Sequence, residues 1–498
     1  MSIHIASHEP VSSEPVRDDI VSAPPREPGL WFRTALLPGG WAESVRVQTS
    51  DGRISVVESG VAPLPGDERA VVGLPGVPNV HSHAFQRGMA GLTESRSAAG
   101  QTEADSFWSW RQLMYQFVGR LSPDDLAALA AQAFLEMLEA GFTRVCEFHY
   151  VHHDVNGRSY ANVAEMGERI AEAAATTGIA LTLLPVFYAH GGFGGAPPSA
   201  QQARFLNDVD GYRRLVEASR RAVAPLADGV VGIAPHSLRA VTPDELGNIL
   251  PFAAGGPVHI HVAEQIREVQ ECTAALGARP VQWLMNAMPV DARWCLVHAT
   301  HVTDDEVTAF ARSGAVAGLC PITEANLGDG VFPAATFQAR GGQYAVGSDS
   351  NVRIDLSEEL RLLEYGQRLR DGARNVLAQA AGSSTGRALY DAAVTGGAQA
   401  AGVIGASGLV VGAPASGVAR VSGLAVGAHA DIVSLADDVV LAARAGDAIL
   451  DTFIFASPRA AIDGVWRAGK KLVSGGVHVK RAALASRFRA ALQRLLAA

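Results

Sequence analysis

Lysine is almost missing from this chain of 498 residues, in which Lys470, Lys471 and Lys480 are the only lysines. Arginine supplies the rest of the side-chain positive charge. Because no lysine precedes Lys470, any site that depends on a lysine side chain is excluded from the chain before that position. A metal site that uses a lysine would have to lie near the C-terminus.

Cysteine is also scarce, with four residues that lie far apart in the sequence. No two of them form a CxxC pair, which excludes the zinc-knuckle and redox-motif patterns. A free cysteine packs as a small hydrophobic residue. We therefore expect buried, structural thiols at Cys146, Cys272, Cys295 and Cys320.

Long apolar runs, basic clusters and a signal-peptide pattern are absent as well. No run is long enough to span a membrane, and a formal net charge of −9 offers nucleic acid no basic surface. The N-terminus lacks a charged-then-apolar signal pattern. These absences indicate a cytosolic protein, and 48% hydrophobic residues suffice for a large buried core.

Eight nearly continuous apolar runs alternate with amphipathic segments, some of which begin at N-cap signals such as Ser122, Thr242 and Thr303. Buried strands separated by helices predict a parallel sheet covered on both faces. Eight strands favour an α/β fold of the (β/α)₈ TIM-like barrel type. A doubly wound open sheet is the alternative, although no GxGxxG turn follows the first strand. The runs are 77–84, 143–151, 179–189, 229–237, 257–264, 294–300, 315–321 and 343–350.

Strand patterns also occur at both ends of the chain. An alternating segment around Asp51 and Gly52 predicts a tight hairpin, and Ala468 with Gly469 predicts another turn. We expect these N- and C-terminal strands to form one small β-sandwich domain beside the barrel. The predicted parts are a flexible arm (1–28), the β domain (29–74 and 406–480), the barrel (75–405) and a C-terminal helix (481–498).

Polar residues of the metal-ligand type stand at the ends of several predicted strands. His81 and His83 lie two residues apart, which puts both imidazoles on one side of a strand. His261 and Asp349 end the fifth and eighth strands. Because barrel sites are built at the carboxyl ends of strands, these four residues predict a site for a divalent metal such as zinc, with a position left for water. Glu264 and His298 follow at neighbouring strand ends.

Several motifs carry a family resemblance: NVHSHAFQRGMAG, DSFWSWRQLMY, EFHYVHHD, APHSLRAV, HIHVAEQ, LVHATH, CPITEANLGDG and GSDS. Together they resemble the formimidoylglutamate deiminases of histidine degradation, within the amidohydrolase superfamily. Many members of that superfamily hold a second metal through a carboxylated lysine on strand four. Since no lysine precedes Lys470, the resemblance implies a mononuclear site here, with Glu147 as the one alternative bridge to a second metal.

The resemblance implies hydrolysis of N-formimidoyl-L-glutamate to N-formyl-L-glutamate and ammonia by a single metal-activated water. One Zn²⁺ per chain is expected, with Fe²⁺ or another divalent metal as an alternative, and the family pattern implies a homodimer. The expected metal ligands are His81, His83, His261 and Asp349. The expected catalytic residues are Glu264, His298 and Asp349, and the expected substrate-binding residues are Gln86, Arg111, Tyr150, His236 and Arg239.

The two arginines also make sense without the resemblance, because a substrate with two carboxylates calls for guanidinium forks. Two other interpretations stay open at this point. The first is another amidohydrolase deaminase that acts on a guanine-like cyclic amidine, which would not need Arg111 and Arg239 for carboxylates. The second is a catalytically inactive barrel that serves as a scaffold. Two departures from the family pattern are the insert at 95–104, ahead of Arg111, and Asn351, where a histidine is expected.

Overall fold

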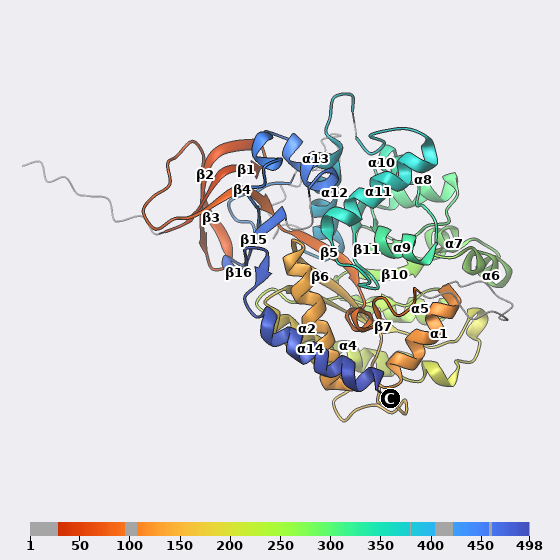
Figure 1. The fold of residues 1–498 in the computed structure, drawn as a ribbon. Helices are drawn as coiled ribbons and strands as arrows, with labels where there is room; N and C mark the ends of the chain where they lie inside the picture. The colour runs from red at the N-terminus through yellow and green to blue at the C-terminus, as the bar shows by residue number, and fades with distance from the viewer. Residues whose placement is uncertain (1–27, 95–106, 379, 404–421, 458–460, 498) are drawn as a thin grey trace, which may run out of the picture.

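The computed structural model describes residues 28–94, 107–378, 380–403, 422–457 and 461–497. The predicted arm (1–28) apart from Pro28, the insert at 95–104 and residues 406–421 of the predicted β domain lie outside the described residues. Figure 1 shows a barrel ringed by helices, with a β-sheet built from the two ends of the chain beside it.

Eight parallel strand positions, which we call staves, form the barrel, and this confirms the predicted fold class. Two strand groups, β5-β6-β7-β8 with β9 on β7, and β10-β11-β12-β13, are each parallel throughout. Bridges between Ser82 and Asp349 and between Ile233 and Val258 join the groups into a closed ring. The strands are β5 (Val77–Ser82), β6 (Phe142–His149), β7 (Ala180–Phe187), β8 (Val230–Val231), β9 (Ala234–Pro235), β10 (Val258–Val262), β11 (Trp294–His298), β12 (Val316–Leu319) and β13 (Gln343–Val346).

The fourth stave is interrupted where the sequence predicted one continuous strand. At Gly232 the backbone passes so close to β10 that a Cβ there would lie 2.4 Å from the Pro257 carbonyl oxygen. Gly232 N–H donates to Leu183 of β7, whereas Ile233 N–H donates to Pro257 on the other side. The stave therefore changes hydrogen-bonding partner at this glycine, and only two short strands remain.

Capping side chains set the starts of the helices around the barrel. Ser122, Thr242 and Thr303 each accept a hydrogen bond from the backbone three residues on and form a capping box. The predicted starts are therefore confirmed. The α-helices are α1 (Phe107–Val118), α2 (Pro123–Glu139), α3 (Glu165–Thr177), α4 (Val209–Val223), α5 (Pro243–Ile249), α6 (Ile266–Leu276), α7 (Pro280–Ala287), α8 (Asp304–Ser313), α9 (Pro321–Leu327), α10 (Ala334–Ala339), α11 (Leu356–Asp371), α12 (Thr385–Ala400), α13 (Ala448–Phe455) and α14 (Arg481–Leu496).

The two ends of the chain share one eight-stranded sheet, in the order β17-β16-β15-β14-β4-β1-β2-β3. The antiparallel pair of β14 with β4 joins the C-terminal half of the sheet to the N-terminal half. The strands are β1 (Leu30–Leu37), β2 (Gly40–Ser50), β3 (Arg53–Glu58), β4 (Glu68–Pro75), β14 (Ile432–Leu435), β15 (Ile462–Arg467), β16 (Lys470–Ser474) and β17 (Val477–His478). The domain limits themselves stay a prediction.

Both predicted hairpin turns lie in this sheet. Asp51 and Gly52 have φ values of 52° and 76°, and Ala468 and Gly469 have 49° and 76°. Two successive positive φ values match the twist of a two-residue hairpin. The four cysteines are buried and free, as expected. Among the described helices, none is both long enough and apolar enough to cross a membrane.

Candidate metal and substrate site

A cavity lies at the carboxyl ends of the barrel strands. With the exception of His81, which is fully buried, every residue predicted for the site lines it. The structure therefore brings together residues from six of the eight staves or the segments that follow them. The lining residues from the predicted set are His83, Gln86, Arg111, Tyr150, His236, Arg239, His261, Glu264, His298 and Asp349.

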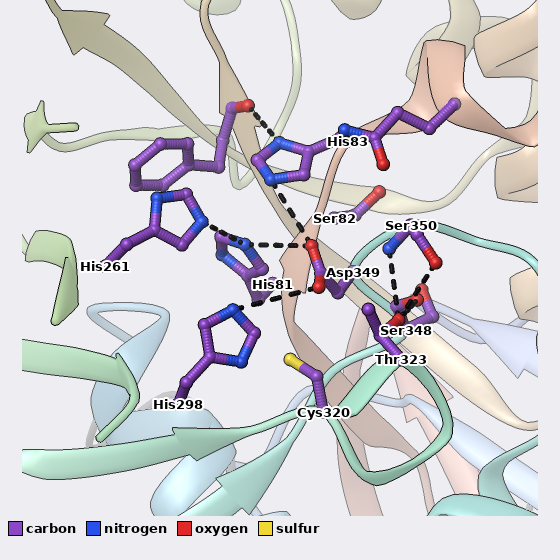
Figure 2. A network of polar contacts seen from close by, with 12 residues as sticks. His81, Ser82, His83, His261, His298, Cys320, Thr323, Ser348, Asp349 and Ser350 are labelled. Atoms are coloured by element: carbon purple, nitrogen blue, oxygen red, sulfur yellow. Dashed lines mark hydrogen bonds and ion pairs between the residues drawn. The ribbon is translucent and has the colours of Figure 1, made fainter. Parts of the chain in front are cut away.

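Four of these groups converge on one point (Figure 2). His81, His83, His261 and Asp349 each offer one ligand atom, and all four atoms lie within 4.8 Å of one another. Nε2 of His81 and Nε2 of His83 each lie 3.3 Å from Asp349 Oδ1. The Nε2 atoms of His81 and His261 lie 3.0 Å apart. We call this set the four-ligand cluster.

Backbone carbonyls fix which ring nitrogens point into the cluster. His83 Nδ1 lies 2.9 Å from the Phe148 carbonyl oxygen, and His261 Nδ1 lies 3.1 Å from that of His236. Because a carbonyl only accepts, each Nδ1 carries the proton, and the Nε2 lone pair faces the cluster. Of the four groups that converge here, only His81 could still direct a proton at the other ligand atoms. The donor set therefore fits a bound cation.

The protonation states of the cluster point the same way. Burial lowers the pKa of His81 to about 3, and burial also lowers the pKa of His83 and of His261. These imidazoles are therefore uncharged near neutral pH and keep their lone pairs. Burial opposes ionisation of Asp349, but the neighbouring histidines outweigh it and hold the pKa of this carboxyl below its usual range. Three neutral imidazoles and one carboxylate are a common ligand set for a divalent metal.

His298 and Glu264 lie beside the four-ligand cluster rather than in it. His298 Nε2 is 3.8 Å from Asp349 Oδ2 and 3.8 Å from Glu264 Oε1. Burial opposes protonation of His298, but Glu264 and Glu324 outweigh it and raise its pKa to about 10. Burial raises the pKa of Glu264 to about 7. His298 is therefore a cation near neutral pH, and Glu264 can gain or lose a proton there.

Sequence reasoning missed two carboxylates that support this pair. Glu324 Oε1 lies 3.3 Å from His298 Nδ1 and accepts a hydrogen bond of 2.8 Å from Cys320 N–H. Asp329 accepts a hydrogen bond from the Gln265 amide, and burial together with Glu264 raises its pKa to about 8. Both residues lie in the motif CPITEANLGDG, which supported the family resemblance but gave these positions no role.

Several residues at the strand ends have left-handed backbone conformations. His298 has φ 65°, Asp349 has φ 45° and Asn351 has φ 54°. Such conformations cost free energy in non-glycine residues and persist where surrounding contacts hold them. Asn351 Nδ2 donates to the carbonyl oxygens of His83 and Asp349, both at 3.1 Å. The asparagine that replaces an expected histidine thus ties two ligand-bearing segments together.

The substrate side of the cavity holds the predicted polar groups and one that was not predicted. Gln86 Nε2 donates to Tyr150 Oη at 2.9 Å, and Arg111 Nη2 donates to Tyr188 Oη at 3.0 Å. Arg111 reaches the cavity from α1, even though the insert precedes that helix in the sequence. Arg239, from the segment after β9, also lines the cavity. Tyr188 directly follows β7, a position that could have marked it.

Four other polar residues near these strands make structural contacts. His152 Nε2 donates to the Val186 carbonyl at 2.9 Å, and His153 Nε2 donates to that of Leu206 at 2.6 Å. Glu147 Oε1 accepts a 2.7 Å hydrogen bond from Ala84 N–H. His149 is buried against the ring of His152. All four lie outside the four-ligand cluster.

Comparison with known proteins places this site in a family. Residues 72–472 match the model of the "Amidohydrolase family", and residues 31–71 match "Formimidoylglutamate deiminase HutF, N-terminal domain". The chain is 50% identical to a formimidoylglutamate deiminase of Pseudomonas aeruginosa, over 94% of this chain and 99% of that protein. It is 27% identical to an 8-oxoguanine deaminase of the same species, over 61% of this chain and 66% of that protein.

Solved structures agree. An amidohydrolase from Brucella melitensis has a TM-score of 0.88 and 50% identity, covering 94% of this chain and all of that one. An adenosine deaminase from Xanthomonas campestris, solved with bound zinc, shares the fold with a TM-score of 0.75 and 21% identity, covering 95% of this chain and all of that one. The matched model spans most of the chain, including every residue of the candidate site. The chain therefore belongs to the amidohydrolase family.

Proposed function

We propose that this protein hydrolyses N-formimidoyl-L-glutamate to N-formyl-L-glutamate and ammonia, as a step of histidine degradation. One observation carries the proposal: Arg111 and Arg239 line the same cavity as the four-ligand cluster. The substrate has two carboxylates and one amidine carbon, so it needs two guanidinium partners beside a hydrolytic centre. The 50% identity to a formimidoylglutamate deiminase supports the same choice.

In this proposal the four-ligand cluster holds one divalent ion, most simply Zn²⁺, with Fe²⁺ or another divalent metal as the alternative. Such an ion, when bound, supplies Lewis-acid activation of water. The chain lacks a lysine before Lys470 that could be carboxylated as a bridge. Glu147, the alternative bridge, is not among the residues whose ligand atoms converge on the cluster. Both facts favour a single ion per chain.

The side chains around the cluster then move the protons. Asp349 Oδ2 accepts the proton of the attacking water, and His298 Nε2, which is 3.8 Å away and protonated near neutral pH, orients that water and stabilises the negative charge that develops. The water oxygen bonds to the formimidoyl carbon, and the bond from that carbon to the terminal nitrogen breaks. Glu264, 3.8 Å from His298, carries a proton to the departing nitrogen, which leaves as ammonia. The formyl group of the product keeps the water oxygen.

The cavity also offers an acceptor for the amidine end of the substrate. Gln86 uses its Nε2 to donate to Tyr150, which leaves its buried Oε1 without a protein partner in the described part of the chain. A buried, unpaired amide oxygen is costly unless a ligand satisfies it. In the proposal this oxygen accepts a hydrogen bond from an amidine N–H, and His236 packs beside the substrate.

The test is ammonia release by the zinc-loaded protein from N-formimidoyl-L-glutamate, run beside guanine, 8-oxoguanine and related cyclic amidines. We expect release from the formimidoyl substrate alone. Release of ammonia only from a ring substrate would agree with metal-dependent hydrolysis but would contradict the binding of two carboxylates by Arg111 and Arg239. A protein that binds metal and releases ammonia from none of them would favour the scaffold interpretation.

Two further expectations belong to this proposal. The family resemblance implies a homodimer, and an enzyme of amino-acid degradation is expected in the cytosol. Sedimentation of the purified protein tests the first expectation, and cell fractionation tests the second.

A further inference from the structure

Tyr188 lies in the cavity wall without an assigned role. It follows β7 directly and is 3% exposed. Its ring meets the ring of His236 edge-on, with centroids 4.7 Å apart, and lies 5.8 Å from the Phe205 ring. These contacts hold the ring in place, so the direction of its hydroxyl group is set by the protein.

Two donors point at the Tyr188 oxygen. Arg111 Nη2 lies 3.0 Å away and can only donate. Gln202 Nε2 lies 2.7 Å away. The orientation of the Gln202 amide is fixed because its Oε1 accepts a 2.7 Å hydrogen bond from Ser199 N–H. The Tyr188 oxygen therefore accepts two hydrogen bonds from the protein.

A phenol oxygen has two lone pairs and one proton. With both lone pairs directed at Arg111 and Gln202, the Tyr188 proton has to point in the remaining direction. Within the described residues, Arg111 and Gln202 are its hydrogen-bond partners, and neither accepts the proton. The hydroxyl is thus a preset donor beside a guanidinium group, on the wall of the cavity.

We propose that Tyr188 and Arg111 together bind one carboxylate of the substrate, with the Tyr188 hydroxyl donating to one of its oxygens. This inference rests on the proposed function and adds a residue that determines specificity. A neutral amide in the same place offers a weaker acceptor and no charge to the guanidinium, so the subsite selects a carboxylate. Gln202 acts as a positioning residue, because it turns the hydroxyl proton toward the ligand.

The first test is the variant Tyr188→Phe, which keeps the ring contacts with His236 and Phe205 and removes the hydroxyl group. A hydrogen bond to a charged group is worth about a 10- to 100-fold change in binding. We expect KM for N-formimidoyl-L-glutamate to rise about 10- to 100-fold, while kcat stays within about threefold. Tyr365→Phe, on α11 and partly exposed, is the matched control and should leave both constants unchanged.

The second test uses three competitive inhibitors: N-formyl-L-glutamate and its two monoamides. Tyr188→Phe should raise the inhibition constant of the diacid and of one monoamide by the same factor. It should leave the inhibition constant of the other monoamide, which lacks the carboxylate that Arg111 binds, unchanged. A purely structural role would raise all three constants together and would overturn the inference, as would an unchanged KM.

Two further measurements keep the outcome decisive. Gln202→Leu frees the hydroxyl to rotate, and it should give a smaller rise in KM with the same monoamide pattern, even if Tyr188→Phe fails to fold. Calorimetric binding of N-formyl-L-glutamate does not require turnover. If the wild-type protein neither turns over the formimidoyl substrate nor binds this product, the proposed function fails; if both hold and Tyr188→Phe changes neither, only the role of Tyr188 fails.

Discussion

At the residue scale, two backbone carbonyls prepare the candidate metal site. The carbonyl oxygens of Phe148 and His236 accept from the Nδ1 atoms of His83 and His261, so that both Nε2 lone pairs face the four-ligand cluster. Hydrogen bonds of this kind orient metal-ligating histidines and keep them in one tautomer. The site is therefore preformed by contacts that do not themselves involve the ion.

His261→Ala and Glu264→Gln should separate metal binding from proton transfer. His261 belongs to the four-ligand cluster and Glu264 does not. We expect His261→Ala to lose bound metal and turnover together. Glu264→Gln should keep one metal per chain and lose about 100- to 10,000-fold in kcat. Metal analysis of both variants beside their kinetics checks this. Full metal content in His261→Ala would contradict the ligand assignment.

Arg239→Ala tests the carboxylate pocket. Arg239 is largely buried in the cavity wall, and a charge-assisted hydrogen bond to substrate is lost when it is truncated. We expect kcat/KM for N-formimidoyl-L-glutamate to fall about 100-fold, mostly through KM, with metal content unchanged. Arg293→Ala, a surface variant whose partner is Asp291, is the control. An unchanged KM in Arg239→Ala would show that Arg239 does not bind a carboxylate of the substrate.

The sequence predicted single ligands better than their supporting contacts. His81, His261 and Asp349 could be found because each stands at the end of a strand, and strand ends meet at one edge of a barrel. Glu324 was missed, since its role depends on where α9 brings it, and Tyr188 was missed although it directly follows β7. The distance of 3.3 Å between His298 Nδ1 and Glu324 Oε1 depends on where α9 lies relative to β11, and the pattern of apolar residues in a strand does not encode that position.

At the element scale, close backbone approaches hold helices and strands in register. Gly396 of α12 lies so near β13 that a Cβ there would be 2.2 Å from the Tyr344 carbonyl oxygen. Because β13 leads directly to Asp349, the position of α12 also supports the site. The capping boxes and eight strands could be predicted from local patterns. The break at Gly232 could not, because it depends on contact with Pro257 from another stave.

Gly396→Ala should therefore destabilise the protein. The added methyl group has no room and forces α12 away from β13, which we expect to lower the free energy of unfolding by about 1–3 kcal/mol. Gly247→Ala in α5, where an added Cβ meets nothing within 4 Å, should be neutral or stabilising by up to about 1 kcal/mol. Urea unfolding of both variants measures the difference. Equal stability would contradict the packing of α12 described above.

At the scale of the whole molecule, the four-ligand cluster joins distant parts of the chain. His81 and His83 come from the first stave and its end, His261 from the fifth, and Asp349 from the end of the eighth. The sequence also predicted that the two chain ends form one β unit, and the eight-stranded sheet agrees. The pairing of β14 with β4 could not be predicted, because strand order within a sheet depends on contacts between segments far apart in sequence.

Metal removal should therefore weaken the whole fold. A ligand that binds only the folded state stabilises it by about 4 kcal/mol when its free concentration is about 1,000 times its Kd. We expect chelator treatment to lower the midpoint of thermal unfolding, and added zinc to restore it. His261→Ala should show no such difference between treated and untreated protein. If chelator treatment left the thermal unfolding midpoint of the wild-type protein unchanged, this would contradict a metal bound by residues from several staves.

The most direct measurement of the proposed reaction is product analysis in H₂¹⁸O with N-formimidoyl-L-glutamate as substrate. The formimidoyl carbon carries two C–N bonds, and the proposed reaction breaks the bond to the terminal nitrogen. We predict one equivalent of ammonia and N-formyl-L-glutamate with a single ¹⁸O in its formyl group. L-glutamate with formamide as products, or ammonia from a cyclic amidine alone, would contradict the proposed reaction.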